Sequence, residues 1–284
     1  MIEMNYDTLI VDGPYLAHRS YSAPYHLTTK AGLDSTMIHS FMRSLNAIRK
    51  KFPTKEIIVA WESHGTPSWR RGMLPTYKPG KTLEGAFIQE IKDLQILLHL
   101  LNITQYSSEC NEADDVIATY VAHNSNKNIL IFTVDKDIMQ LVNGTTHVYD
   151  GHTVYHETSV LQKFGVMPDR IPDLLALCGD SADNIEGIEG IGRKKASQII
   201  KEYDCVENIP FPICSFSKIN LSQYVVLRNK KLTLLNKECE LISYVPELIT
   251  TIEAVLDKYE LKKMKEDIKE YKQMEKSTSL EDFF

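Results

Sequence analysis

Cysteine is scarce in this chain of 284 residues, and no two cysteines have the spacing of a metal-binding or redox motif. The five cysteines are scattered along the chain: Cys110, Cys178, Cys205, Cys214 and Cys239. An odd number of dispersed cysteines argues against a disulfide framework and against a zinc site. We therefore expect reduced thiols and an intracellular, cytoplasmic protein.

Long apolar runs are also missing. The longest, residues 94–103, is interrupted by His99 and Asn102 and is shorter than the ~20 residues of a membrane-spanning helix. The chain starts without the basic and apolar stretches of a secretory signal, and it holds neither an internal repeat nor a low-complexity tract. Because 43% hydrophobic and 25% charged residues are ordinary for a globular protein, we exclude a membrane span, a fibre and a disordered chain.

Nucleophilic side chains are present without the partners that catalysis requires. The nine histidines are dispersed, and none of those inspected has metal-ligand spacing or a triad partner: His18, His26, His39, His64 and His99. Serine and cysteine lack a nucleophile motif or a paired base. We treat these histidines as surface or packed residues.

The formal net charge is −6, which at first argues against a polyanionic ligand. Binding depends on where charges lie and not on their total, so the pattern along the chain decides the matter.

Apolar runs of strand length alternate with helical periodicity in the first half of the chain. Strands are predicted at residues 8–12, 56–61 and 128–134, and helices at 34–51, 88–101 and 111–123, the last capped by Asn111. Buried strands that alternate with helices are typical of an α/β fold with a mainly parallel sheet and helices on both faces.

The apolar strands cease after Thr153, and short helices and turns follow from Pro168 onward. We place a boundary near 155–167. The predicted organisation is an α/β core at 1–160, a smaller helical region at 161–257, and a charged helix or tail at 258–284.

Acidic residues gather where the predicted strands end and the helices begin. Strand ends carry Asp12, Glu62 and Asp135; the other acids are Glu112, Asp114, Asp115, Asp137, Asp180 and Asp183, the last two on one predicted helical face. Ligands of an open α/β sheet bind at the carboxyl ends of its strands, and carboxylates without Cys or His partners suit Mg²⁺, with Mn²⁺ as a substitute. Each acid taken singly could instead be a helix cap or turn residue.

Setting these nine acids aside reverses the balance of charge, because 29 acidic residues then face 32 Lys and Arg. A basic segment lies between Ser63 and Leu83, with aromatic residues among its cations: Arg70, Arg71, Lys78 and Lys81, with Trp69 and Tyr77. Cations neutralise phosphates and aromatic faces stack on unpaired bases. The segment indicates single-stranded nucleic acid, although a solvated loop remains an alternative.

A second basic element follows a glycine motif. Gly187, Gly190 and Gly192 precede the cations Arg193, Lys194 and Lys195. Glycine lets a backbone approach a ligand closely, and a helix that starts near Arg193 offers free N–H groups to a phosphate. A dinucleotide loop is disfavoured because no apolar strand precedes the motif. A helix–helix turn without a ligand remains an alternative.

Five segments together resemble the structure-specific 5′-nuclease family, which includes phage 5′-exonucleases, flap endonucleases and the 5′-nuclease domain of bacterial DNA polymerase I. In family order they are IVDG (10–13), WRRGMLPTYKPGK (69–81), EADDVIA (112–118), TVDKDIMQL (133–141) and GDSADNIEGIEGIGRKKA (179–196). The resemblance implies a PIN-like nuclease core, a basic arch at about 63–88 and a helix-hairpin-helix region at 187–192.

The resemblance also assigns roles. It implies one metal cluster from Asp12, Glu62, Glu112 and Asp114, supported by Asp115, and a second completed by Asp180 and Asp183. Asp135 and Asp137 lie toward the second cluster, and the division of the central acids between the two ions stays open. Glu62 departs from the family's usual Asp. Lys78 corresponds to a lysine that stabilises charge at the scissile phosphate, and Lys81, also given a catalytic role, stands where the phage enzymes tend to have an arginine. Tyr77 corresponds to a base-stacking tyrosine, and Arg70 and Arg71 lie in the DNA-binding arch. The hairpin would grip duplex DNA through its backbone, with K⁺ between carbonyls and phosphate.

We therefore expect a divalent-metal-dependent 5′-3′ exonuclease and 5′-flap endonuclease that acts as a monomer on branched or 5′-ended DNA and on RNA/DNA hybrids during replication and repair. Two alternatives are a catalytically inactive DNA-binding accessory protein and an Asp-nucleophile phosphatase; Pro14 argues against the second, because an acid belongs there. The terminal Leu280, Phe283 and Phe284 resemble a sliding-clamp-binding peptide, with Ser277 where glutamine is usual.

Overall fold

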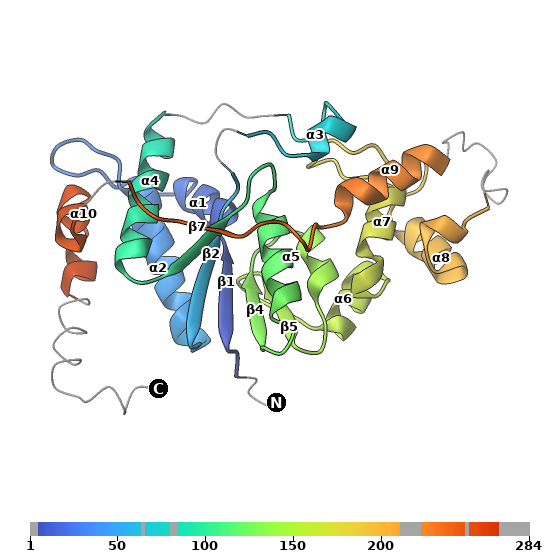
Figure 1. The fold of residues 1–284 in the computed structure, drawn as a ribbon, viewed down its shortest axis with the longest axis horizontal. Helices are drawn as coiled ribbons and strands as arrows, with labels where there is room; N and C mark the ends of the chain where they lie inside the picture. The colour runs from blue at the N-terminus through green and yellow to red at the C-terminus, as the bar shows by residue number, and fades with distance from the viewer. Residues whose placement is uncertain (1–4, 64–65, 80–84, 211–222, 248–249, 267–284) are drawn as a thin grey trace.

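A mainly parallel sheet forms the centre of the protein (Figure 1). The computed structural model describes all residues except 1–4, 64–65, 80–84, 211–222, 248–249 and 267–284. In the described part the sheet has seven strands in the order β6-β5-β4-β1-β2-β3-β7. Their bounds are β1 Thr8–Asp12, β2 Glu56–Ala60, β3 Thr104–Ser107, β4 Ile129–Phe132, β5 Thr146–Tyr149, β6 Val154–Tyr155 and β7 Ile242–Ser243.

The central strand β1 pairs in parallel with β2 on one side and β4 on the other, with Ile10 opposite Ile58 and Ile131. All five residues of β1 are buried. Since alternate side chains of a strand point to opposite faces, β1 contributes to two separate apolar layers. Only the short edge strands β6 and β7 run antiparallel to their neighbours in the described sheet.

Helices cover both faces of the sheet (Figure 1). One apolar layer joins the sheet to α1 Gly13–Tyr21, α2 Thr36–Lys51, α4 Gly85–Leu100 and α10 Ile252–Lys258. The other joins it to α5 Ala113–His123, α6 Glu157–Phe164, α7 Ile171–Cys178, α8 Arg193–Tyr203 and α9 Gln223–Thr233. The short helices are α3 Arg70–Met73, η1 Asp137–Leu141, η2 Pro168–Arg170 and η3 Val206–Asn208.

The predicted fold class is confirmed: a mainly parallel sheet carries helices on both faces, and a helical region follows it. The three predicted strands and three predicted helices are present with ends shifted by a few residues. Three details were wrong. The strands β3 and β5 were missed, strands do not cease after Thr153, and the N-cap of α5 is Glu112 and not Asn111.

The end of the described chain returns to the sheet. Strand β7 pairs with β3, and next to α10 both Lys258 Nζ and the Tyr259 hydroxyl lie 2.5 Å from Asp93 Oδ2 on α4. Residues 242–243, which we assigned to the helical region, therefore belong to the sheet of the core. Among the described residues, no helix combines the length and the apolar character needed to span a bilayer.

Candidate active site

Acidic residues lie at the carboxyl ends of the strands, which point toward the top of Figure 1. Asp12 is the last residue of β1, and parallel pairing places it beside the end of β2 at Ala60. The glycine that follows Asp12 makes this close approach possible, because a Cβ on Gly13 would lie 2.7 Å from the Ala60 carbonyl oxygen and from the Trp61 ring. The Asp-Gly sequence therefore places Asp12 where the chain after β1 packs closely against the end of β2.

Asp12 is fixed by two hydrogen bonds. Its Oδ1 accepts from the Tyr15 backbone N–H at 3.0 Å, and its Oδ2 accepts from the Thr133 hydroxyl at 2.7 Å. The same hydroxyl oxygen accepts the backbone N–H of Asp135 at 3.1 Å, so Thr133 links two acids. Burial, reinforced by the nearby charge of Asp135, raises the pKa of Asp12 to about 6. Thr133 was missed because no sequence signal marked its role.

The start of α5 supplies the next acids. Glu112 is the N-cap residue, and Asp114 lies 8% exposed in the first turn. Burial raises the pKa of Asp114 well above its usual range, and the charges of Asp135 and Asp12 add to that effect. Asp12, Asp114 and Asp135 are therefore close enough to repel one another, as expected from their positions at the carboxyl edge.

A second cluster forms from Asp137, Asp180 and Asp183, each of which has one carboxylate oxygen within 4.8 Å of an oxygen of the other two. The backbone N–H of Asp137 donates to Asp135 Oδ1 at 2.8 Å, so Asp135 leads into this cluster. Asp180 and Asp183 lie in a turn closed by paired hydrogen bonds between Asp180 and Ile185, and not on the helical face that we expected.

This cluster fits a hard divalent cation. Asp137 Oδ1 is buried and has no hydrogen-bond partner among the described residues. Burial raises the pKa of Asp137 and, to about 6, that of Asp183, with neighbouring carboxylates adding to both. The ligands available here are all oxygens, which suit Mg²⁺ or Mn²⁺. Such a cation would remove the repulsion among the carboxylates and the cost of the buried oxygen without a partner.

Two predicted metal ligands stand apart. Glu62 is exposed, two residues beyond the end of β2. Asp115 is fully buried, and both of its oxygens accept from the Arg70 guanidinium, at 2.7 and 2.8 Å. Its oxygens also accept from the backbone N–H groups of Glu112 and Asn236, so its acceptor sites are filled and the structure does not support a ligand role for Asp115. Its role is structural, next to the cluster.

The prediction that Arg70 contacts DNA was wrong for the same reason. Arg70 is 1% exposed, and it also donates to the Leu232 and Leu234 carbonyls on or beside α9 and to Glu112. Burial lowers the pKa of a guanidinium, but the charges of Asp115 and Glu112 outweigh burial and raise it here. Arg70 thus joins α3, α5 and the region of α9 into one support behind the acids.

The Tyr77 side chain also points inward, toward the acidic residues. It is 2% exposed, and its hydroxyl lies 2.9 Å from Glu112 Oε2 and 3.1 Å from Asp183 Oδ2. Its ring therefore offers no face to an unpaired base in this conformation, which contradicts the stacking role that we predicted. Burial raises the pKa of Tyr77, so the hydroxyl stays protonated and can donate between the two acids.

Lys78 is the cation at the centre of the acids. Its Nζ lies 3.3 Å from Glu112 and 3.7 Å from Asp183, and its side chain is 37% exposed. Burial works against its charge, but Glu112 and Asp114 raise its pKa, so it stays an ammonium. The backbone of Lys78 has a φ of 39°, a strained value for a residue with a side chain, and its N–H donates to the Asp183 carbonyl.

The rest of the basic segment is only partly described. Arg71 is exposed, and its guanidinium donates to the Lys78 carbonyl at 2.7 Å. Lys81 falls outside the described residues, as do Leu280, Phe283 and Phe284 of the terminal peptide, so their predicted roles stay predictions.

The glycine hairpin divides into a packed part and an open part. A Cβ on Gly187 would lie 2.3–2.4 Å from backbone atoms of Cys178 and Gly179, so packing accounts for this glycine and DNA contact does not. Gly190 and Gly192 are exposed, a Cβ on either would meet no atom within 4 Å, and Gly190 has a φ of 76°. The open side can receive a ligand.

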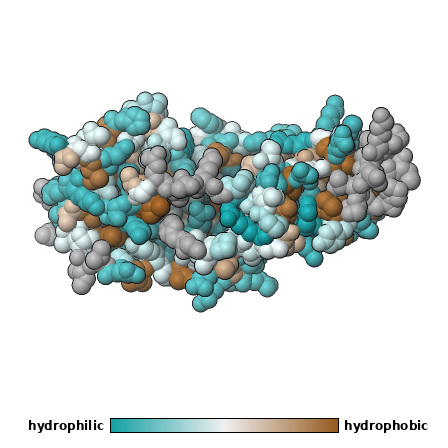
Figure 2. All heavy atoms as spheres, turned by 90° about the horizontal axis from the view of Figure 1, so that it is seen from above, coloured by the Kyte–Doolittle hydropathy of each residue, from teal (hydrophilic) through white to brown (hydrophobic). Residues whose placement is uncertain are grey.

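The cations of the hairpin face outward. Gly192 is the N-cap residue of α8, and Arg193, Lys194 and Lys195 occupy its first turn, all exposed. The Lys195 ammonium donates to the Gly190 carbonyl at 2.8 Å. Figure 2, which views the molecule from above, shows hydrophilic residues across the middle of the upper face with apolar residues scattered among them.

Comparison with known protein families matches nearly the whole chain. Residues 7–165 match the family described as 5′-3′ exonuclease, N-terminal resolvase-like domain, and residues 166–278 match its C-terminal SAM fold. A 5′-3′ exonuclease of Mycoplasmopsis pulmonis is 32% identical over 228 residues, which is 78% of this chain and 75% of that protein.

A thermostable DNA polymerase I of Thermus caldophilus is 34% identical over 207 residues, or 71% of this chain, but the match spans only 24% of that longer protein. Among solved structures, a mutant T5 5′-exonuclease superposes with a TM-score of 0.65 at 24% identity, covering 81% of this chain and 88% of that one. The structural likeness bears on the fold.

Proposed function

Because this chain belongs to the 5′-3′ exonuclease family and is a nuclease, we propose that it cleaves 5′-ended and 5′-flap strands with divalent cations bound at its acidic edge. Asp12, Glu112 and Asp114 would hold one cation, and Asp137, Asp180 and Asp183 a second, with Asp135 between them. Mg²⁺ is the cation that we propose, with Mn²⁺ as a substitute. We propose Glu62 only as a ligand through water, since it is exposed.

The observation that carries this proposal is the orphaned Asp137 Oδ1 within the cluster of three acids. A buried carboxylate oxygen without a donor is costly, and a cation removes that cost. Lys136 and Lys78 pair with Asp180 and Asp183 of the cluster, whereas no ion pair of the described residues includes Asp137, so a resident cation would supply the charge that Asp137 lacks.

Divalent cations held there would supply Lewis-acid activation of water and stabilisation of the leaving oxygen of a phosphodiester. Lys78 would place a permanent positive charge where negative charge develops on the scissile phosphate. The Tyr77 hydroxyl would hold Glu112 and Asp183 in their orientations, and the pair of Arg70 with Asp115 would hold Glu112 from behind.

The outward cations of the hairpin would bind the duplex arm of a branched substrate. Phosphate contacts carry no sequence information, so recognition would follow the shape of the substrate and would extend to RNA/DNA hybrids. K⁺ at the hairpin stays a prediction, since the Gly190 carbonyl is occupied by Lys195. Clamp binding by the terminal peptide, primer removal and a monomeric state also stay predictions.

Incubation of the protein with a flap substrate tests this function. A duplex with an unpaired 5′ arm, labelled at its 5′ end, would be incubated with Mg²⁺, with Mn²⁺ and with EDTA. We expect release of the arm near the junction with either cation and none with EDTA. The same duplex with an unpaired 3′ arm, labelled at its 3′ end, serves as the control, and its arm should not be released at the junction.

An Asp137→Asn variant checks that the acidic edge is responsible. The amide keeps the size of the side chain but removes the charge that a cation requires. We expect cleavage to fall by at least about 100-fold, as for loss of a group that acts in the transition state. Cleavage near the wild-type rate would overturn the assignment of the second cation. A non-catalytic accessory protein is disfavoured, because the chain keeps all the acids of the two proposed cation sites.

A further inference from the structure

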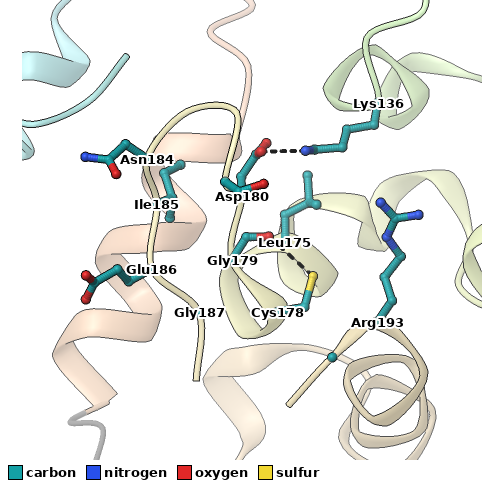
Figure 3. A pocket seen from close by; sticks show the side chains of 12 residues that line it. Lys136, Leu175, Cys178, Gly179, Asp180, Asn184, Ile185, Glu186, Gly187 and Arg193 are labelled. Atoms are coloured by element: carbon teal, nitrogen blue, oxygen red, sulfur yellow. Dashed lines mark hydrogen bonds and ion pairs between the residues drawn. The ribbon is translucent and has the colours of Figure 1, made fainter. Parts of the chain in front are cut away.

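A pocket of about 490 Å³ lies between the second acidic cluster and the glycine hairpin, and the cleavage chemistry proposed above does not use it. Asp180 lines one side, and Gly187 and Gly192 of the hairpin line another. Figure 3 shows two cationic side chains, Lys136 and Arg193, on its wall. The pocket thus connects the proposed cleavage region with the proposed duplex-binding region.

Lys136 is engaged by an acid of the cluster. Its Nζ lies 2.5 Å from Asp180 Oδ1, the contact drawn as a dashed line in Figure 3. Asp180 is 3% exposed and belongs to the cluster with the orphaned Asp137 oxygen. A divalent cation in that cluster would compete with the ammonium for Asp180, because two positive charges at one carboxylate repel each other.

The Arg193 side chain is positioned to bind an anion. Its side chain is exposed, and its guanidinium lies 5.6 Å from the centre of the Phe164 ring, which supports one of its faces. No ion pair joins Arg193 to a carboxylate within the described part of the chain. Its N–H groups can therefore bind a phosphate in the fork geometry that guanidinium favours.

We propose that this pocket binds one backbone phosphate of the nucleic-acid substrate, and that Lys136 joins Arg193 on that phosphate only when a divalent cation has taken Asp180. The inference rests on the proposed function, since it requires the second cation. In the cation-free protein Lys136 neutralises Asp180. Once the cation binds, the Lys136 ammonium turns into the pocket and pairs with a phosphate of the DNA instead of with Asp180.

The exchange predicts a measurable coupling. If the cation frees Lys136 for DNA, then DNA must strengthen binding of the cation by the same factor, because the two binding free energies are linked. The enzyme would then hold its second cation most tightly when a duplex lies across the hairpin.

The first measurement needs no cleavage. Mn²⁺ binding to the DNA-free protein would be titrated by electron paramagnetic resonance for wild type, Lys136→Met and Lys55→Met. Lys55 is a matched control, an exposed lysine before β2 at the opposite edge of the sheet. We expect Lys136→Met to bind one Mn²⁺ more tightly by about tenfold, because its competitor is gone, and Lys55→Met to match wild type.

The second measurement is the salt dependence of duplex binding. Anisotropy of a short labelled duplex would be followed against salt concentration, with Ca²⁺ and with EDTA. Each phosphate contact adds about 0.9 to the slope of log affinity against log salt. With Ca²⁺ we expect the Lys136→Met slope to be smaller than wild type by about one, and with EDTA the slopes should agree. Arg193→Met should lose about one in both conditions.

The outcomes separate this inference from the proposed function. Unchanged Mn²⁺ affinity in Lys136→Met would overturn the exchange even if cleavage is normal. An equal loss of slope with Ca²⁺ and EDTA would also overturn it, because Lys136 would then be a constant phosphate contact. Lys136→Gln should reproduce the behaviour of Lys136→Met, and a melting curve confirms that both fold. If wild type binds no Mn²⁺ at all, the proposed function itself is wrong.

Discussion

The two basic segments of this protein use their cations in opposite ways. In the segment before α4, Arg70 and Lys78 turn inward and bind carboxylates of the acidic edge. In the hairpin before and within α8, Arg193 and Lys194 turn outward and are exposed. Both segments have the composition of a nucleic-acid-binding stretch, so composition alone does not distinguish a cation that supports the site from one that binds substrate.

The difference follows from what each segment packs against. The first lies over α5 and the end of α9, where buried carboxylates need counter-charges. The second is anchored by apolar side chains, since Ile188 and Ile191 are buried and the glycines between and after them face solvent. Inward cations should therefore affect stability and chemistry, whereas outward cations should affect affinity. The predictions below test this division.

The largest effect is expected for Arg70→Met. The change leaves the Asp115 charge buried without a partner, so the free energy of unfolding should fall by about 3–5 kcal/mol, measured by urea denaturation. The neighbouring Arg71→Met is the matched control and should change stability by less than about 0.5 kcal/mol, because Arg71 is exposed.

A double variant sharpens this test. Arg70→Met combined with Asp115→Leu removes both charges, and most of the lost stability should return, since no ion is then stranded in the interior. If Arg70→Met proves as stable as Arg71→Met, the inward pairing does not support the acidic edge.

The next effect is expected for Lys78→Ala. Removal of a cation beside the scissile phosphate should slow single-turnover cleavage on the order of 100-fold while DNA affinity changes little. Single-turnover rates beside equilibrium binding on the same flap substrate check this. If Lys78→Ala lowers DNA affinity but leaves the single-turnover rate unchanged, Lys78 acts like the outward cations, and the division between the two segments is wrong.

The main parts of the fold could be predicted because their signals are local. The strands β1, β2 and β4 are continuous apolar runs, as central parallel strands require. The strands β3 and β5 were missed because they contain Gln105 and His147. Gln105 is satisfied by Trp61 and by the Gln95 carbonyl, and His147 by Tyr6, contacts that exist only after folding.

The candidate site was predictable to the same extent. Topology alone sends the acids that follow β1 and β4 to one edge, so Asp12 and Asp135 could be placed together. The pairing of Arg70 with Asp115 joins residues 45 positions apart, and the direction of an arginine side chain has no signature in the sequence. Thr133, which links Asp12 and Asp135, was invisible for the same reason.

A third, smaller effect concerns pH, because the inward cations do not neutralise the acidic edge completely. Without a cation, burial and neighbouring carboxylates raise the pKa of Asp12 and Asp183 to about 6. Between about pH 4 and 6 the folded state then binds more protons than the unfolded state, so stability should increase as pH falls through this range.

Urea unfolding in EDTA from pH 7.5 to 4.5 checks this sign. Mg²⁺ should stabilise the protein at pH 7.5 and lose its effect toward pH 5, because protons and the cation compete for the same carboxylates. The Asp12→Asn variant should lose part of the pH dependence in EDTA. If stability in EDTA instead decreases as the pH is lowered from 7.5 to 4.5, Lys78 and Arg70 already neutralise the acidic edge.

The smallest effect is expected at the outward cations. Lys194→Gln and Lys195→Gln together should lower the salt slope of duplex binding by about two while leaving single-turnover cleavage at saturating protein and thermal stability unchanged. The reason is that both residues are exposed in the first turn of α8, where a lost phosphate contact strands no buried charge. Single-stranded DNA of equal length is the control, and its affinity should fall less. An equal loss on both substrates would mean that the hairpin senses charge and not the duplex, and a loss of cleavage at saturation would place these lysines with the inward set.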